Sequence, residues 1–372
     1  MSVSFRKRGS KWYYSVKDKK GRTIESRAFK TKKEAQIVGN ARNELLFRGY
    51  DIANEKTLYE LWQEWYQTTI VPQNKREYTL YLYELRGRWI KEYLSDVPAT
   101  KIKYSRYQSV LTTLGQKQCK NVISRFNSDV RKVIAFARRD KIDIDDFTQG
   151  ALITSQKIGK KPTEKSLTNL SDYMRLKEAI KRKISDKYVV SYYVLFVALK
   201  TGLRAGENLG LTWDCIDFEK KTIKTYRRYD TSKRRFCPPK TETSVREVPI
   251  DDELIEVLRQ LKESQNKLLN KYAIKNEENF IYLTYENKVP LRYAANQCLQ
   301  RILKREKIYP SQLTLTSLRH SYASYLLAKG IDIWVVSNVM GHKNIEQVTK
   351  TYGHLLKEKR DNEFQLIRQS LI

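Results

Sequence analysis

Five side chains in the second half of the sequence have the chemistry needed to cut a phosphate diester. They are Arg204, Lys240, Arg319, His342 and Tyr352. Two guanidinium groups can fork onto phosphate oxygens and stabilise the charge of the transition state. A phenol has a pKa of about 10, so it needs cationic neighbours before it attacks as a phenolate. The lysine ammonium can protonate the leaving oxygen, and the histidine can hydrogen-bond a phosphate oxygen or the nucleophile.

Each of these residues lies in a distinctive local sequence. Arg204 follows Thr-Gly-Leu and precedes Ala-Gly-Glu, Lys240 lies in Pro-Pro-Lys-Thr, Arg319 in Leu-Arg-His, His342 in Gly-His-Lys and Tyr352 in Thr-Tyr-Gly. In this order and these contexts they resemble the catalytic residues of the tyrosine recombinase, or phage integrase, family. The resemblance covers the C-terminal half closely and the whole chain more loosely. It implies a site-specific DNA recombinase with the tyrosine as nucleophile.

The resemblance also implies a mechanism and partners. Attack by the tyrosine leaves a 3′-phosphotyrosine and a free 5′ hydroxyl, and religation then needs no cofactor and no metal ion. The expected protein is an integrase of a temperate phage or conjugative transposon, acting as a homotetramer on double-stranded DNA at core and arm sites. Participation of an accessory DNA-bending protein or an excisionase stays open. Two alternatives also stay open: a dimer resolvase or invertase with the same chemistry, and a non-catalytic DNA-binding regulator on this scaffold.

One position departs from the family pattern. The residue three before the second arginine is usually His, sometimes Lys, and here it is Thr316. A hydroxyl can hydrogen-bond a phosphate oxygen, but it cannot be a general base near neutral pH. We expect Thr316 to keep the hydrogen bond and to lose the base role. The substitution Thr316→His is then expected to raise the rate of cleavage of a suicide substrate.

The charge of the chain favours a polyanionic partner. Its 72 Lys and Arg residues against 42 Asp and Glu residues leave a net charge of +30, and each neutralised phosphate of a nucleic acid releases a counterion. Four cysteines without a CxxC pair and only three histidines argue against a zinc site. No signal peptide and no apolar run of the ~18 to 20 residues that span a bilayer is present. We expect a cytoplasmic, nucleoid-associated protein without a membrane partner.

The expected fold is α+β and mainly α, in three domains. Residues 1–52 are predicted to form a three-stranded β-sheet plus a helix, which resembles an arm-site DNA-binding domain. Residues 57–156 are predicted to form a helical core-binding domain. Residues 163–372 are predicted to form a mixed catalytic domain with a C-terminal tail, after a polar and basic linker.

The N-terminal sheet is predicted from two β-rich segments, residues 11–16 and 22–29, on either side of a turn. A sheet this small needs its own aromatic core. We therefore expect Trp12, Tyr13 and Phe29 to pack inside it. The sheet would also have an exposed basic face that suits a DNA groove, formed by Arg6, Lys7, Arg8, Lys11, Lys17 and Arg22.

Helices are predicted from capping and periodicity. Thr31 and Glu34 have the spacing of a capping box. A helix that begins after Thr57 carries one apolar face, and a helix over residues 122–137 carries an apolar face and a basic face. The apolar face of the first helix consists of Leu58, Leu61, Trp62 and Trp65. The basic face of the second consists of Arg125, Arg131, Lys132, Arg138 and Arg139, which fits contacts with phosphates.

Two further predictions concern the catalytic half. Residues 222–226 and 245–250 are expected to be the two arms of a hairpin, with Lys240 at its tip. The tail, residues 358–372, is amphipathic. It fits either a segment that docks on a neighbouring subunit or a helix packed on its own domain.

Overall fold

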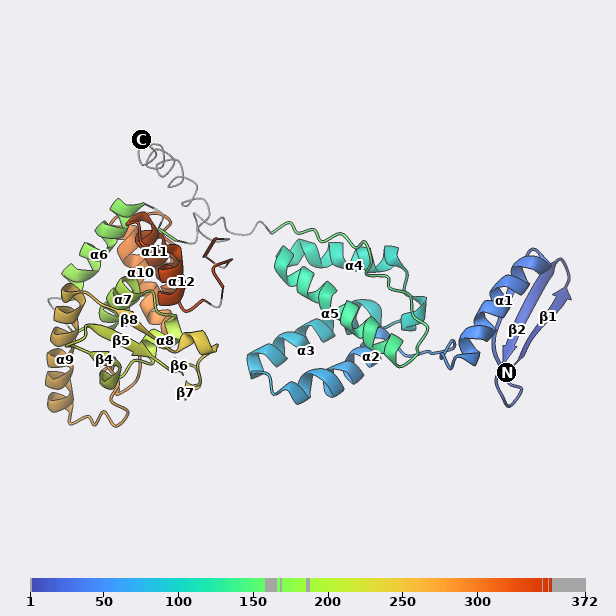
Figure 1. Ribbon diagram of the computed structural model, residues 1–372, viewed down its shortest axis with the longest axis horizontal. Coiled ribbons are helices and arrows are strands. Elements are labelled where there is room, and N and C mark those ends of the chain that lie inside the picture. The colour runs from blue at the N-terminus through green and yellow to red at the C-terminus, as the bar shows by residue number, and fades with distance from the viewer. Residues whose placement is uncertain are drawn as a thin grey trace, which may run out of the picture. The chain divides into compact units, whose positions relative to one another are not determined.

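The computed structural model describes residues 2–157, 166–167, 169–184, 188–342, 344–346 and 348–349 (Figure 1). They belong to two compact units, Met1–Gly159 and Lys160–Ile372. Helices predominate, and a small sheet opens the chain, so the predicted α+β class is confirmed. Within the described residues, no helix is long and apolar enough to cross a membrane.

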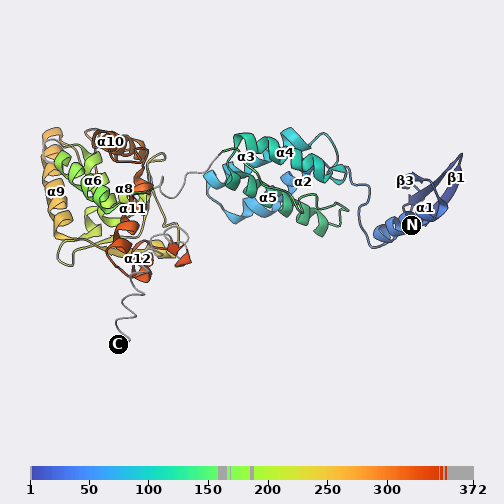
Figure 2. The same ribbon diagram turned by 90° about the horizontal axis from the view of Figure 1, so that it is seen from above.

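The first unit begins with an antiparallel sheet in the order β1-β2-β3, and α1 covers one of its faces (Figure 1, Figure 2). The bounds are β1 Ser2–Arg8, β2 Lys11–Lys17, β3 Thr23–Phe29 and α1 Lys32–Phe47. The capping box predicted for α1 is confirmed. The Thr31 hydroxyl accepts a hydrogen bond from the Glu34 N–H, and the Glu34 carboxylate accepts one from the Thr31 N–H.

The core of this sheet differs from the predicted one. Tyr14 is its largest buried side chain, and Phe29 packs partly against it. The prediction that Trp12 and Tyr13 lie in the core is wrong. Because side chains alternate along a strand, Tyr13 lies on the face opposite Tyr14 and away from α1. Trp12 shares the face of Tyr14 but is only half-buried, with Lys32 Nζ 5.3 Å from the centroid of its ring.

The rest of the first unit is helical and has an apolar core of its own. Its α-helices are α2 Leu58–Trp65, α3 Glu77–Leu94, α4 Tyr104–Lys117 and α5 Lys120–Arg139. All four residues of the predicted apolar face of α2 are buried. The five basic residues predicted on α5 are exposed opposite its apolar face. Arg86 Nε donates to Asp129 Oδ2 at 2.7 Å, a buried ion pair that ties α3 to α5.

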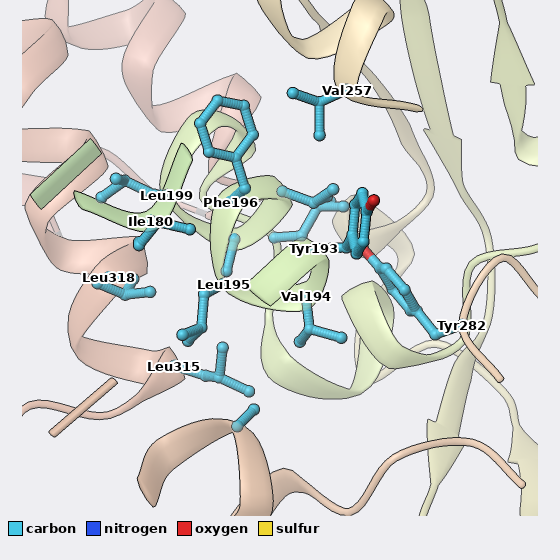
Figure 3. Close-up of a cluster of buried hydrophobic side chains, with 14 of the residues drawn as sticks. Ile180, Tyr193, Val194, Leu195, Phe196, Leu199, Val257, Tyr282, Leu315 and Leu318 are labelled. Carbon is cyan, nitrogen blue, oxygen red and sulfur yellow. The ribbon is translucent and has the colours of Figure 1, made fainter. Parts of the chain in front are cut away.

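The second unit is built around the apolar helix α7. Helices α6, α9, α10 and α11 pack around α7, and Figure 3 shows its buried side chains among those of its neighbours. Its helices are α6 Leu170–Ile184, α7 Val190–Thr201, α8 Ala205–Leu209, α9 Asp252–Tyr272, α10 Arg292–Arg305, α11 Leu315–Ala328 and α12 Ile333–Val339. Its strands are β4 Ile216–Asp217, β5 Thr222–Thr225, β6 Arg228–Asp230, β7 Arg235–Cys237 and β8 Arg246–Pro249.

The strands of this unit confirm one part of the predicted hairpin and correct another. Strands β5 and β8 pair antiparallel, as expected for the two arms. The connection between them is not a single tip, because it contains a second antiparallel pair, β6 with β7. Lys240 follows β7 in an irregular segment and is exposed. The prediction that it lies at the tip of a hairpin is therefore wrong.

Candidate active site

The first arginine is held at the junction between two helices. Gly202 caps the C-terminal end of α7 and has a φ of +62°. A Cβ at this glycine would lie 2.5 Å from a ring carbon of Tyr322 and 3.0 Å from the sulfur of Met340. Only glycine fits such a conformation at such a close approach. The chain then turns through Leu203, which is buried, so that Arg204 stands immediately before α8.

Arg204 makes three side-chain hydrogen bonds to the protein. Its Nη1 donates to Glu207 Oε1 at 2.8 Å and to Ser244 Oγ at 3.1 Å. Its Nη2 donates to the carbonyl of Gly341 at 2.8 Å. Glu207 also accepts from the backbone N–H of Arg204 at 3.0 Å. Glu207 therefore supports both the guanidinium and the start of α8.

The second arginine is buried in the middle of the unit. Arg319, in the second turn of α11, is 5% exposed. Its Nη1 donates to the carbonyl of Gly202 at 2.8 Å, and its Nη2 donates to the carbonyl of Met340. The two predicted arginines thus lie side by side, because they bond adjacent carbonyls, those of Met340 and Gly341.

A third arginine completes this arrangement. Arg246 Nε donates to the carbonyl of Val339 at 2.6 Å. Three guanidinium groups therefore bond three successive carbonyls, 339 to 341, at the end of α12. The last carbonyls of a helix have no partner within the helix, and cations are favoured at that end of its dipole. The end of α12 is consequently fixed to the arginines.

Glu207 supplies the negative charge that lets two of these arginines lie close together. Its Oε2 accepts from Arg246 Nη2 at 3.1 Å, while its Oε1 bonds Arg204. Burial raises the pKa of Glu207, but the charges of Arg246 and Arg204 outweigh it and hold the pKa below its ordinary value. Burial lowers the pKa of Arg246, although Glu207 opposes that effect. This carboxylate stays ionised and bridges the two guanidinium groups.

His342 follows directly after the anchored end of α12. Its backbone N–H donates to the carbonyl of Ser337 at 3.0 Å. Its buried Nδ1 has no hydrogen-bond partner in the part of the chain that the structure describes. Burial, and then the charges of Arg319 and Arg204, lower the pKa of His342 to about 4. The imidazole is therefore neutral near pH 7 and can accept a proton or a hydrogen bond.

The remaining predicted residues are placed less directly. Lys240 precedes Thr241, whose Oγ1 lies 3.0 Å from Ser244 Oγ, and that oxygen also accepts from Arg204. A short chain of hydrogen bonds thus connects the side chain of Thr241, the residue after Lys240, to Arg204. Thr316 lies one turn before Arg319 on α11 and is exposed. The predicted nucleophile, like the predicted amphipathic tail, lies outside the described residues.

Comparison with known proteins now identifies the family. Residues 167–359 match the model of the phage integrase family. The chain belongs to the phage integrase family. It is a site-specific recombinase of the tyrosine type.

Relatives of this phage integrase family member match it over different lengths. A tyrosine recombinase XerC-like protein of Caldanaerobacter subterraneus subsp. tengcongensis is 26% identical over an alignment of 408 positions, gaps included, and the alignment covers 98% of each chain. The ICEBs1 integrase of Bacillus subtilis is 28% identical over 166 residues, 44% of this chain and 45% of that one. A solved structure of a Tn1549 transposon integrase in complex with circular intermediate DNA is 19% identical, covers 84% of this chain and 99% of that one, and has a TM-score of 0.67. It supports the same fold.

Sequence reasoning missed one structural partner of the integrase site. Arg246 lies in β8, in the stretch Val-Arg-Glu-Val-Pro-Ile, which the sequence marks only as a strand. The sequence signal that could have indicated Arg246 was a charged residue within a predicted strand. Within the described residues, no group of three or more His, Cys, Asp or Glu side chains could hold a metal ion.

Proposed function

We propose that this recombinase cuts and rejoins double-stranded DNA through a 3′-phosphotyrosine at Tyr352. The observation that carries the proposal is that Arg204 and Arg319 bond the carbonyls of Gly341 and Met340, just after α12 and directly before His342. Two guanidinium groups that are far apart in the sequence bond adjacent carbonyls, and a neutral imidazole follows those carbonyls in the chain. A phosphate diester with developing negative charge is the substrate that such a site stabilises best.

In the proposed step, the phenol oxygen of Tyr352 forms a bond to phosphorus while the bond from phosphorus to the 5′ oxygen breaks. The phenol proton passes to His342 or to water. Lys240 donates a proton to the leaving 5′ oxygen. Arg204 and Arg319 hold the non-bridging oxygens throughout. In religation the 5′ hydroxyl attacks the phosphotyrosine and the same proton transfers run in reverse.

The charge of the chain and the DNA-bound structures of similar integrases support DNA as the proposed partner. The net charge of +30 favours binding to a polyanion. The five basic side chains of α5 offer phosphate contacts that position DNA without reading its sequence. The similar Tn1549 and λ integrases were solved with DNA. We further propose a homotetramer that integrates or excises a mobile element, with residues 1–52 binding arm sites, residues 57–156 binding core sites and residues 163–372 performing catalysis.

The experiment starts by capturing DNA fragments that the full-length protein binds and sequencing them. The best binder is made as a nicked duplex, so that a cleaved strand loses its short 5′-hydroxyl fragment and cannot be religated. After incubation, denaturing gel electrophoresis separates a covalent protein–DNA adduct from free protein. We expect an adduct with the wild type and none with Tyr352→Phe.

A variant at another tyrosine of the same unit provides the control. Tyr293 is 69% exposed on α10, so Tyr293→Phe is expected to leave adduct formation unchanged. If the wild-type protein binds the duplex tightly and yet forms no adduct, the chain acts as a regulator on a recombinase scaffold. The proposed catalytic role would then be abandoned.

A further inference from the structure

A guanidinium lies beside the position at which this chain departs from the family pattern. Arg292, the first residue of α10, donates from Nη2 to the hydroxyl of Thr316 at 2.9 Å. Both side chains are exposed. Thr316 and Arg319 are three residues apart on α11, so they lie on the same face of the helix, one turn apart. Arg292 is therefore held within about one helical turn of a predicted phosphate-binding arginine.

The position of Arg292 is fixed by a polar stripe along α10. Asn296, one turn further along, accepts from the N–H of Leu315 at 2.9 Å. Gln300, two turns along, donates to the carbonyl of Leu313 at 3.4 Å. Residues 292, 296 and 300 lie on one face of a helix. All three contact the segment that starts α11, so the packing of α10 against that segment sets where Arg292 stands.

In the described part of the chain, neither an ion pair nor the helix dipole stabilises the fold through Arg292. Arg292 forms no ion pair with any carboxylate among the residues that the structure describes. It occupies the first position of α10, where the helix dipole disfavours a cation. Elsewhere in this unit, Arg204 and Arg246 share the carboxylate of Glu207. An exposed cation without a carboxylate, beside the proposed phosphate site, has an anionic ligand as its natural partner.

We propose that Arg292 is a further catalytic residue of this recombinase. Together with the hydroxyl of Thr316, its guanidinium binds a non-bridging oxygen of the scissile phosphate next to Arg319. It supplies the positive charge and the hydrogen bond that a His or Lys at position 316 would supply, and it transfers no proton. This inference rests on the proposed phosphotyrosine reaction. It also explains how the site tolerates a threonine at that position.

The first test compares single-turnover cleavage of the suicide substrate by Arg292→Gln and by a matched control. The control is Arg305→Gln, the same change of charge at the exposed C-terminal end of α10. Loss of one preorganised donor at a reacting oxyanion commonly costs 10²- to 10³-fold. We expect Arg292→Gln to lower the cleavage rate constant by about 10²-fold, with Arg305→Gln at the wild-type rate. Equal rates for the two variants would overturn the proposal.

The second test separates a catalytic from a structural role. A methylphosphonate at the scissile position replaces one charged non-bridging oxygen by a methyl group. We expect the penalty of Arg292→Gln to shrink several-fold for at least one methylphosphonate diastereomer, because the oxygen that Arg292 binds is gone. The same penalty on the phosphate and on both diastereomers would mean that Arg292 only supports the fold.

The third test asks for rescue. The substitution Thr316→His should restore most of the cleavage lost in Arg292→Gln, because it returns a donor to the same place. No rescue, together with unchanged DNA affinity, would contradict the assignment. Adduct formation by the wild type separates a failure of the proposed reaction from a failure of the role of Arg292. If the wild type forms no adduct, the phosphotyrosine reaction fails; if the wild type cleaves and Arg292→Gln matches it, only the role of Arg292 fails.

Discussion

Replacing Glu207 by glutamine would test the buried charge network that holds the arginines together. Glu207 is 4% exposed, and its two carboxylate oxygens bond Arg204 and Arg246. Glutamine has nearly the same size, so the substitution removes the charge and little else. The Arg246 side chain, 8% exposed, would lose its carboxylate partner. Two like charges would then lie beside each other without a counter-ion.

The expected loss of stability can be bounded from the contacts. Removing one partner of a buried ion pair costs about 3–5 kcal/mol, because the other charge stays buried. Arg204 is 28% exposed, so solvent screens its share. Arg246 keeps its hydrogen bonds to the carbonyls of Val339 and Ser244. We therefore expect Glu207→Gln to lower the unfolding free energy of this unit by about 3 kcal/mol, at the lower end of that range.

The effect should also depend on pH in a definite direction. The folded-state pKa of Glu207 lies below its ordinary value of 4.5. A lowered carboxyl pKa stabilises the fold above the ordinary pKa, and that stabilisation is lost as the pH falls through the folded-state value. The difference in stability between the wild type and Glu207→Gln should therefore be full at pH 7 and shrink below about pH 4.5.

Native-state hydrogen exchange on the full-length protein measures this effect locally. Peptides from α7, the buried helix at the centre of the unit, report its opening free energy. The control is Glu219→Gln, an exposed carboxylate in the same unit, which is expected to change the opening free energy by less than about 0.5 kcal/mol. An effect of Glu207→Gln as small as that of the control would refute the bridging role of this carboxylate.

Three other predictions follow from the same geometry. Lys240→Met should slow cleavage by roughly 10²- to 10⁴-fold. A substrate with a 5′-thiol leaving group, which needs no proton, should restore the rate of this variant. If the variant stays slow on the thiol substrate, Lys240 is not the general acid. Burial and the neighbouring arginines disfavour the charged imidazole, so the pKa of His342 is lowered to about 4 from its ordinary value of about 6.5. The fold is therefore destabilised as the pH falls from about 6.5 towards 4, because the unfolded chain binds a proton there and the folded chain does not. His342→Gln should remove that pH dependence, worth roughly 1–2 kcal/mol after solvent screening; an unchanged slope in chemical denaturation would contradict the assignment. Gly202→Ala should lower the free energy of unfolding by about 2–5 kcal/mol, from backbone strain and a clash with Tyr322. Gly330→Ala, at a φ of +85° with nothing within 4 Å of an added Cβ, should show the strain alone, about 1–2 kcal/mol. Equal losses of stability in the two variants would mean that the clash with Tyr322 is relieved by movement of its neighbours.

Features with local causes could be predicted from the sequence. The capping box at Thr31 depends on residues three positions apart, and it is present. The end of α7 at Gly202 follows from a glycine after an apolar run. The buried face of α2 follows from its periodicity.

Features that depend on tertiary packing could not be predicted in this way. Lys240 was misplaced because β6 and β7 pair within the connection between β5 and β8, and strand pairing is non-local. Arg246 becomes part of the site only because β8 packs beside Glu207, 39 residues away in the sequence. Arg292 meets Thr316 across 24 residues, through the packing of α10 on α11. In the small sheet, one residue of strand register decides that Tyr14 rather than Tyr13 is buried.

The most direct test of the central claim is to map the covalent adduct. Cleaved suicide substrate is digested with a protease and a nuclease, and mass spectrometry locates the nucleotide on the protein. We predict a single modified peptide with a 3′-linked phosphate on the phenol oxygen of Tyr352, lost in Arg204→Gln and Arg319→Gln proteins that still bind DNA. A phosphate on any other residue, or an adduct that persists without both arginines, would contradict the account.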